Sequence, residues 1–256
     1  MSDGIKILKI AKQGKKYRVE TSEGEHLLTE DTLIKFLVRK DASYSEAEFK
    51  EILKHDEENR LFERVLRYLA QQSRSENEVR EYLSKHGEGE AAEKIILRLK
   101  ALNYLDDRLF AQNLFNYAVN NFRGPRYLEA RLQKSGVAIE ITMEVLERYG
   151  EELEKELISE ILKKNKEKAK EKPARKQKEL MFQKLLRAGF SYGAVQSCLR
   201  DAEFIDESAR LLPEKVRRLE DKFSGLSESK KREKILRRLL GEGYSYEEVM
   251  LHLKSE

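Results

Sequence analysis

The chain has 256 residues and a net charge of +4, and 38% of its residues are charged while 39% are hydrophobic. No apolar run approaches the roughly 18 residues that a membrane span requires, the first 30 residues hold no secretory signal, and a lone Cys198 excludes an internal disulfide. We therefore expect a cytoplasmic protein built from helices with narrow apolar stripes.

The first 30 residues have the period of β-strands. Ile5, Ile7 and Ile10 precede Gln13-Gly14-Lys15, after which Tyr17 and Val19 alternate with Arg18 and Glu20. His26-Leu27-Leu28 follows a turn signal at Ser22-Glu23-Gly24. This pattern predicts a β-hairpin with a third strand. Because so few strands are rarely stable alone, we expect the sheet to pack on the helix that follows.

Two helices are predicted after these strands. Asp31 would cap a helix carrying Leu33, Ile34 and Leu37, and Ser45 with Glu48 three residues later is typical of a capping box. We expect residues 1–56 to form a small α+β domain.

From residue 57 the apolar spacing is helical throughout. Long helices are predicted at about 57–72, 107–121, 151–172 and 207–223, each followed by two shorter ones. Ser75 with Glu78 predicts a capping box, and Pro125 suits the first turn of a helix. The fold class is therefore mainly α, with four tandem three-helix repeats in an elongated, curved array at residues 57–106, 107–150, 151–205 and 206–256.

A repeated block supports these units. Residues 185–195 read LLRAGFSYGAV and residues 239–249, 54 positions later, read LLGEGYSYEEV. An earlier copy places Leu132 and Gly136 at the same spacing, and a fainter one has Leu83 and Gly87. A Gly four residues after a helical Leu is typical of a left-handed helix cap, so these residues are predicted to be structural.

Catalytic motifs are absent from the sequence. The four histidines, His26, His55, His86 and His252, have no second His or Cys at metal-ligand spacing, and there is no phosphate-binding Gly-rich loop or nucleophile elbow. Asp106 and Asp107 precede a predicted helix, which favours N-capping over catalysis. We expect a protein that is not an enzyme and needs no metal or cofactor.

Positive charge gathers in two stretches. Residues 163–178 hold nine Lys or Arg and two Glu, and residues 230–238 hold six Lys or Arg and one Glu. Such runs favour an acidic protein surface or a nucleic acid as the partner, although they are also typical of a solvated helix face. The basic residues predicted to contact a partner or DNA are Arg123, Arg126, Arg131, Lys163, Lys164, Arg175, Lys176, Lys178, Arg187, Lys230, Lys231, Arg232, Arg237 and Arg238.

The order of several motifs resembles that of a known family. Tyr104-Leu105-Asp106-Asp107 is followed by Phe110-Ala111, by Gly124-Pro125, and by Leu132 four residues before Gly136. This series, with the later blocks around Gly189 and Gly243, is similar to the RecX family, regulators of the recombinase RecA. The resemblance covers roughly residues 57–256 and implies the tandem three-helix plan. This sequence departs from the family pattern in the predicted helix before Gly124, where Asn residues stand in place of basic ones and only Arg123 remains.

The resemblance implies a monomer that binds the RecA filament on single-stranded DNA along its groove. It would restrain the recombinase, ATPase and coprotease activities in DNA repair, recombination and the SOS response. An alternative is a helical-repeat protein that binds single- or double-stranded DNA through its basic residues without RecA. A third is a general helical scaffold for another protein partner.

Overall fold

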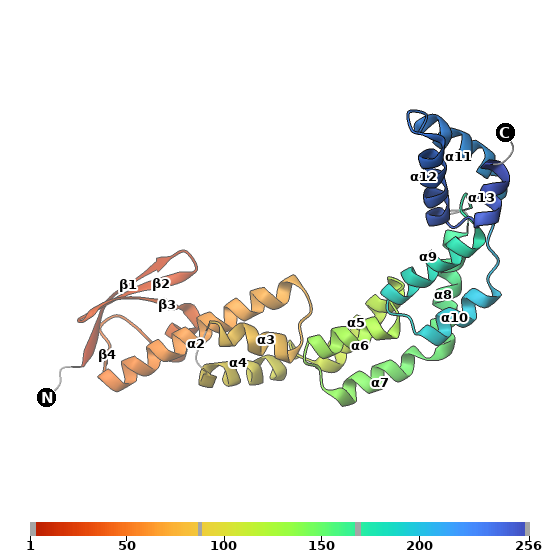
Figure 1. Ribbon diagram of the computed structural model, residues 1–256. Helices are drawn as coiled ribbons and strands as arrows, with labels where there is room; N and C mark the ends of the chain where they lie inside the picture. Colours follow the sequence, from red (N-terminus) through yellow and green to blue (C-terminus); the bar gives the residue numbers. More distant parts are fainter. Residues whose placement is uncertain (1–3, 87–88, 167–169, 254–256) are drawn as a thin grey trace. The chain divides into compact units, whose positions relative to one another are not determined.

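The computed structural model describes residues 4–86, 89–166 and 170–253. An antiparallel sheet is followed by successive groups of three helices (Figure 1). The chain divides into two compact units, the first formed by Met1–Phe110 with Ser135–Val137 and the second by Ala111–Lys134 with Ala138–Glu256. Among the described residues, no helix is both long and apolar enough to cross a membrane.

The sheet of the first unit has the strand order β3-β2-β1-β4. The predicted hairpin and third strand are confirmed as β1 (Ile5–Gln13), β2 (Lys16–Thr21) and β3 (Gly24–Thr29), paired antiparallel. Strand β4 (Ser43–Tyr44) was not predicted, because two residues leave no alternating pattern. It pairs with the start of β1.

The helix after the strands is shorter than predicted. Helix α1 (Glu30–Lys35) begins directly after Thr29, so the prediction that Asp31 caps it is wrong, and Asp31 lies in its first turn. The Val38 amide donates to the Leu33 carbonyl at 2.9 Å and closes the helix before Leu37. Leu37 therefore lies outside the helix, with a left-handed φ of 51° and 76% of its surface exposed.

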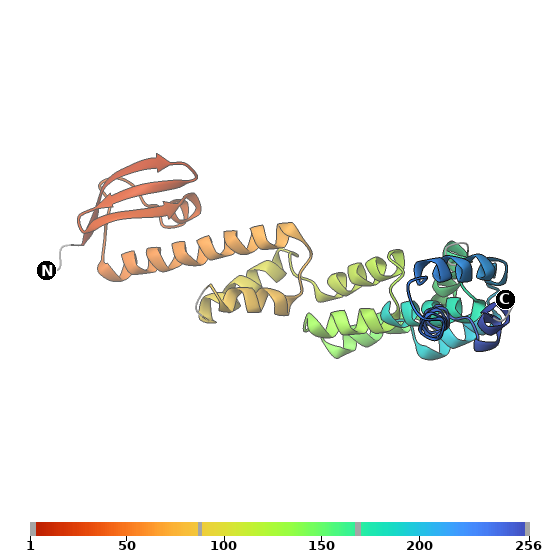
Figure 2. The same cartoon turned by 45° about the horizontal axis from the view of Figure 1, so that its top comes forward.

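Helix α2 (Glu46–Gln71) serves both the sheet and the first three-helix group (Figure 2). The predicted capping box at its start is confirmed, since the Ser45 amide donates to Glu48 at 2.8 Å and Ser45 Oγ accepts from the Glu48 amide. The predicted new helix start at residue 57 is wrong, because no helix breaker interrupts this stretch. Phe49 packs in the core beside the sheet, whereas Val65 packs in the core of the three-helix group.

A buried carboxylate ties the sheet to α2. Asp56 is fully buried, and its Oδ1 accepts from the amide of Thr29 at 2.6 Å and from the hydroxyl of Thr29 at 2.9 Å. Its second oxygen lies 2.7 Å from Nε of Arg60. Because a buried charge is tolerated only when it is paired, these contacts hold the end of β3 against α2.

Four three-helix groups follow one another, as predicted. The first joins α2 to α3 (Glu76–Ser84) and α4 (Gly89–Ala101), and the second contains α5 (Asp107–Asn120), α6 (Pro125–Lys134) and α7 (Ile139–Tyr149). The third contains α8 (Glu151–Asn165), α9 (Ala174–Arg187) and α10 (Tyr192–Asp201), and the fourth α11 (Ser208–Lys222), α12 (Glu228–Glu242) and α13 (Tyr246–Leu253).

Helix α8 does not reach the predicted residue 172. It ends at Asn165, whose side-chain amide donates to the Ile161 carbonyl at 2.7 Å. Part of the predicted extension, residues 167–169, lies outside the described residues, as does Gly87 of the faintest repeat copy.

The glycine caps are confirmed. Gly136, Gly189 and Gly243 have φ values of 67°, 92° and 102°. After Gly189, the Phe190 amide donates to the Leu185 carbonyl, and after Gly243 the Tyr244 amide donates to the Leu239 carbonyl. These are the bonds of a Schellman cap, and both aromatic side chains are buried against the helix that they close.

Candidate partner-binding surface

Each cap glycine also contacts the middle helix of the preceding three-helix group. A Cβ atom on Gly189 would lie 2.5 Å from the backbone nitrogen of Tyr127, in the first turn of α6. One on Gly136 would lie 2.5 Å from Cγ of Asn77 in α3, and one on Gly243 would lie 3.0 Å from Cγ of Lys176 in α9. The glycines therefore permit close packing between groups, a role that the capping pattern does not reveal.

We call these contacts between a cap-glycine turn and a middle helix joints. Aspartates strengthen two of them. Asp107 accepts from the amide of Glu76 at 2.8 Å, and Asp206 accepts from the amide of Ala174 at 2.7 Å. Each amide is the first of a middle helix, where backbone donors lack intrahelical partners. Burial raises the pKa of Asp107. Burial also acts to raise the pKa of Asp206, but bonds from Ser208 and Ala174 outweigh it and lower that pKa overall.

The joint between the second and third groups uses backbone atoms. The Gly124 amide donates to the Ala188 carbonyl at 2.8 Å, and the Arg126 amide donates to the Gly189 carbonyl at 3.0 Å. A Cβ atom on Gly124 would overlap the backbone of Gly189 and Phe190. Gly124 therefore allows the N-terminus of α6 to be capped by the end of α9.

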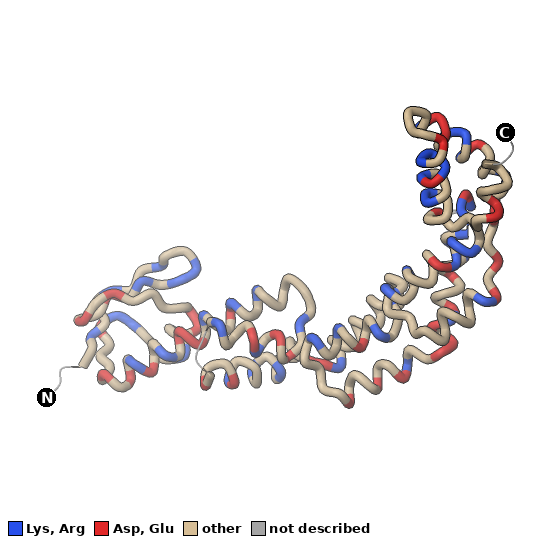
Figure 3. Tube along the Cα trace, viewed as in Figure 1, with Lys and Arg blue, Asp and Glu red and all other residues tan. Residues whose placement is uncertain are grey.

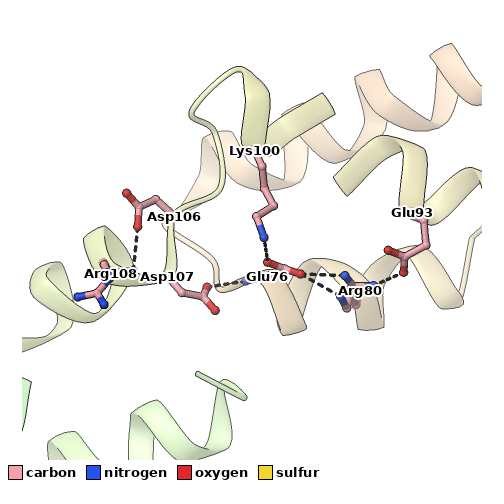
Figure 4. Close-up of polar contacts among 7 residues, drawn as sticks. All are labelled: Glu76, Arg80, Glu93, Lys100, Asp106, Asp107 and Arg108. Carbon is pink, nitrogen blue, oxygen red and sulfur yellow. Dashed lines mark hydrogen bonds and ion pairs between the residues drawn. The ribbon is translucent and has the colours of Figure 1, made fainter. Parts of the chain in front are cut away.

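The motif at residues 104–107 lies beside a charged network in the first unit (Figure 4). Asp106 caps α5 as predicted, accepting from the Arg108 amide at 2.8 Å. Glu76 contacts Lys100 at 2.8 Å and Arg80 at 2.8 Å, and Arg80 also contacts Glu93. Hydrogen bonds from Lys100 and then Arg80 lower the pKa of Glu76.

The other motif residues lie mainly in the core. Leu105, Phe110, Ala111 and Leu132 are buried, whereas the side chain of Tyr104 is more than half exposed. The structure thus places these residues where a scaffold role would require them, with the exception of Tyr104.

Ser75 allows one joint to be tested against a matched cap. Its hydroxyl accepts from the Glu78 amide at 3.1 Å, like Ser45 in the other capping box, but it is fully buried and also donates to the Ser135 carbonyl at 2.5 Å. We expect Ser75→Ala to lower the free energy of unfolding by about 2 kcal/mol and Ser45→Ala by about 1 kcal/mol. Urea denaturation of the two variants measures the difference, and equal losses would show that the bond to Ser135 contributes nothing.

Three of the predicted basic residues meet in one groove of the second unit, which we call the α5–α9 groove. Arg123 comes from the turn after α5, Lys164 from the end of α8, and Arg187 from the end of α9. The groove has a volume of about 550 Å³. Its lining residues are Asn121, Phe122, Arg123, Ile161, Lys164, Asn165, Leu180, Gln183, Lys184, Leu185, Arg187 and Ala188.

The groove combines positive charge with apolar surface. Lys184, which was not predicted, is its fourth basic residue, and no carboxylate is among its described lining residues. Lys184 Nζ lies 3.1 Å from Oδ1 of Asn165, and Lys164 Nζ lies 4.1 Å from the ring centroid of Phe122 and 3.0 Å from Glu160. The sequence contained no signal for Lys184, because it lies outside both basic stretches.

The later basic residues do not form one surface of equivalent sites. Lys176 and Lys230 are each the third residue of their helices, α9 and α12, and Lys178 and Arg232 are each the fifth. The stem of Lys176 packs at the Gly243 joint, however, and its ammonium contacts Glu179 at 3.0 Å. Part of the Lys176 side chain therefore has a structural role.

On α12 basic residues lie among acidic ones (Figure 3), and part of the positive charge is paired. Lys231 contacts Glu228 at 2.6 Å, Arg237 contacts Glu233 at 3.7 Å, and Arg238 contacts Glu242 at 2.9 Å. The remaining predicted residues have no ion pair with any other described residue; they are Arg126, Arg131, Lys163, Arg175, Lys178, Lys230 and Arg232. The ammonium of Lys178 lies 5.8 Å from the ring centroid of Phe204. All of these except Lys178 are exposed.

Comparison with known proteins places this arrangement in a family. A family model described as the first three-helix domain of RecX matches residues 62–99, which span most of the first three-helix group. The regulatory protein RecX of Lactococcus lactis is 27% identical over 264 aligned positions, covering 97% of both chains. That of Listeria monocytogenes is 26% identical and covers 88% of this chain and 85% of the relative. The chain is therefore similar to RecX regulatory proteins over most of its length.

Solved RecX structures share the fold. A crystal structure of regulatory protein RecX is 24% identical, with a TM-score of 0.60 over 77% of this chain and 100% of the other. RecX from Lactobacillus salivarius has a TM-score of 0.51 over 57% of this chain. Because the curated relatives are regulatory proteins, the expectation that this protein is not an enzyme is confirmed.

Proposed function

We propose that this protein binds RecA filaments on single-stranded DNA and restrains the recombinase, ATPase and coprotease activities of RecA. Its similarity to RecX regulatory proteins over most of the chain supports the regulatory role. The observation that supports contact with a partner is the α5–α9 groove, which gathers Arg123, Lys164 and Arg187 from three separate elements. A surface assembled in this way, without a carboxylate among its described lining residues, suits an acidic protein partner.

The joints explain how such a protein would act on a repeating partner. In the second unit, Gly189 and Gly243 each hold one three-helix group against the middle helix of the group before it, so these groups keep a defined spacing. A row of groups with several modest contacts can bind a filament tightly, because each contact raises the effective concentration of the next.

The test is RecA-dependent ATP hydrolysis on single-stranded DNA, measured with increasing amounts of the purified protein. We expect hydrolysis to fall as the protein is added. The controls are RecA alone and the same protein after heat denaturation. Unchanged hydrolysis at a molar excess over RecA would refute the proposal.

Direct DNA binding is the second candidate, because Lys230 and Arg232 on α12 are exposed and have no ion pair with any described residue. Binding to phosphates would weaken steeply as salt rises, since each neutralised phosphate releases a counterion. Filter binding to DNA without RecA separates the two cases: tight, salt-sensitive binding would favour the DNA interpretation.

A further inference from the structure

Phe122 has a strained backbone conformation at a position where glycine would be free of strain. Phe122 has a φ of 53°, and the Arg123 amide donates to the Ala118 carbonyl at 2.8 Å, the bond of a Schellman cap at the end of α5. Glycine is the usual residue at this position, and a bulky residue there is unfavourable. The ring is only partly buried and lines the α5–α9 groove, so core packing does not account for its presence.

Strain of this kind is typical of functional positions. Beside Phe122, the groove presents Ile161 and Leu180 as apolar surface, while Arg123, Lys184 and Arg187 supply positive charge. An occupant that matches both features carries negative charge and an apolar or aromatic group. Two classes of molecule bring these together, an acidic protein segment and a single-stranded nucleic acid.

The contacts of Phe122 favour the protein segment. A nucleic acid would use the aromatic ring by stacking a base on its face. The ammonium of Lys164 lies 4.1 Å from the ring centroid and occupies one face. The apolar groups Ile161 and Leu180 likewise suit an aliphatic or aromatic side chain better than a phosphate backbone.

We propose that the α5–α9 groove binds an acidic protein segment that inserts one apolar side chain beside Phe122. Carboxylates of the segment pair with Arg123, Lys184 and Arg187, and the inserted side chain is desolvated against Ile161 and Leu180. This inference rests on the proposed function for the identity of the partner, and it adds the chemistry that the partner must offer. Such a central apolar anchor with a charged rim is the usual arrangement of a small interface.

Fluorescence polarisation tests the proposal with two synthetic peptides, one of Glu and Asp with a single central Phe and one with Ser in its place. We expect the Phe peptide to bind at least about tenfold more tightly. Phe122→Asn should remove most of that difference, because Asn tolerates the left-handed backbone but offers no ring. Phe122→Gly, which relieves the backbone strain, should likewise remove most of the preference for the Phe peptide. Tyr117→Asn is the matched control, since this exposed aromatic residue on α5 does not line the groove.

Equal binding of the two peptides, or an unchanged preference in both Phe122 variants, would overturn the proposal. Stronger binding of an oligo(dT) strand than of the Phe peptide, lost in the Phe122 variants, would assign the groove to nucleic acid instead. RecA-dependent ATP hydrolysis with the same variants distinguishes this inference from the proposed function. Inhibition of RecA without selectivity for the Phe peptide would refute the inference and leave the proposed function standing. Thermal denaturation of each variant confirms that the fold is kept.

Discussion

Replacing Gly189 with Val is expected to lower the free energy of unfolding by about 3 kcal/mol. Two effects add up: a β-branched residue is strained at a φ of 92°, and its Cβ would lie 2.5 Å from the backbone nitrogen of Tyr127. Because Tyr127 belongs to α6, the clash would push the third three-helix group away from the second. It would also disturb the bond from the Arg126 amide to the Gly189 carbonyl.

Urea denaturation followed by circular dichroism measures this loss. Gly193→Val is the matched control, because Gly193 lies four residues further along the chain and an added Cβ would have no atom within 4 Å beyond its chain neighbours and its own helix backbone. We expect its stability to stay within about 0.5 kcal/mol of the unmodified protein. If both variants lose the same stability, the close contact at the joint does not matter.

Reversing three charges in the α5–α9 groove is expected to weaken binding to RecA at least about a hundredfold. In the variant Arg123→Glu, Lys184→Glu, Arg187→Glu, favourable pairs with an acidic partner become like-charge contacts, which cost several kcal/mol in sum. All three side chains are exposed, so the fold should be kept. The measurement is the protein concentration that halves RecA-dependent ATP hydrolysis.

The control is a variant with the same change in net charge placed elsewhere. Lys50, Arg67 and Lys85 are exposed residues of the first unit that make no ion pair with any described residue, so their replacement by Glu changes the overall charge equally. We expect this control to inhibit RecA nearly as well as the unmodified protein. Similar losses in both triple variants would mean that the groove acts only through net charge.

The local structure of this chain was largely predictable, because short-range physics determines it. Capping boxes at Ser45 and Ser75 satisfy free amides within one turn, and Gly189 and Gly243 adopt the left-handed backbone that ends a helix. Two local features were missed nevertheless. The bond from the Val38 amide to the Leu33 carbonyl closes α1 before Leu37, and α2 continues past residue 57 while packing against the sheet and then against the first three-helix group.

The candidate site shows the same division. The sequence identified Arg123, Lys164 and Arg187 as basic, but only the packing of α8 and α9 beside the end of α5 brings them together with Lys184. It likewise identified the cap glycines, yet their contacts with the preceding middle helices join residues about 60 to 70 positions apart. The sequence by itself determined the helical groups and their caps, because those depend on neighbours within a few residues. Only the tertiary structure decided the joints and the groove, because these depend on which distant surfaces come into contact.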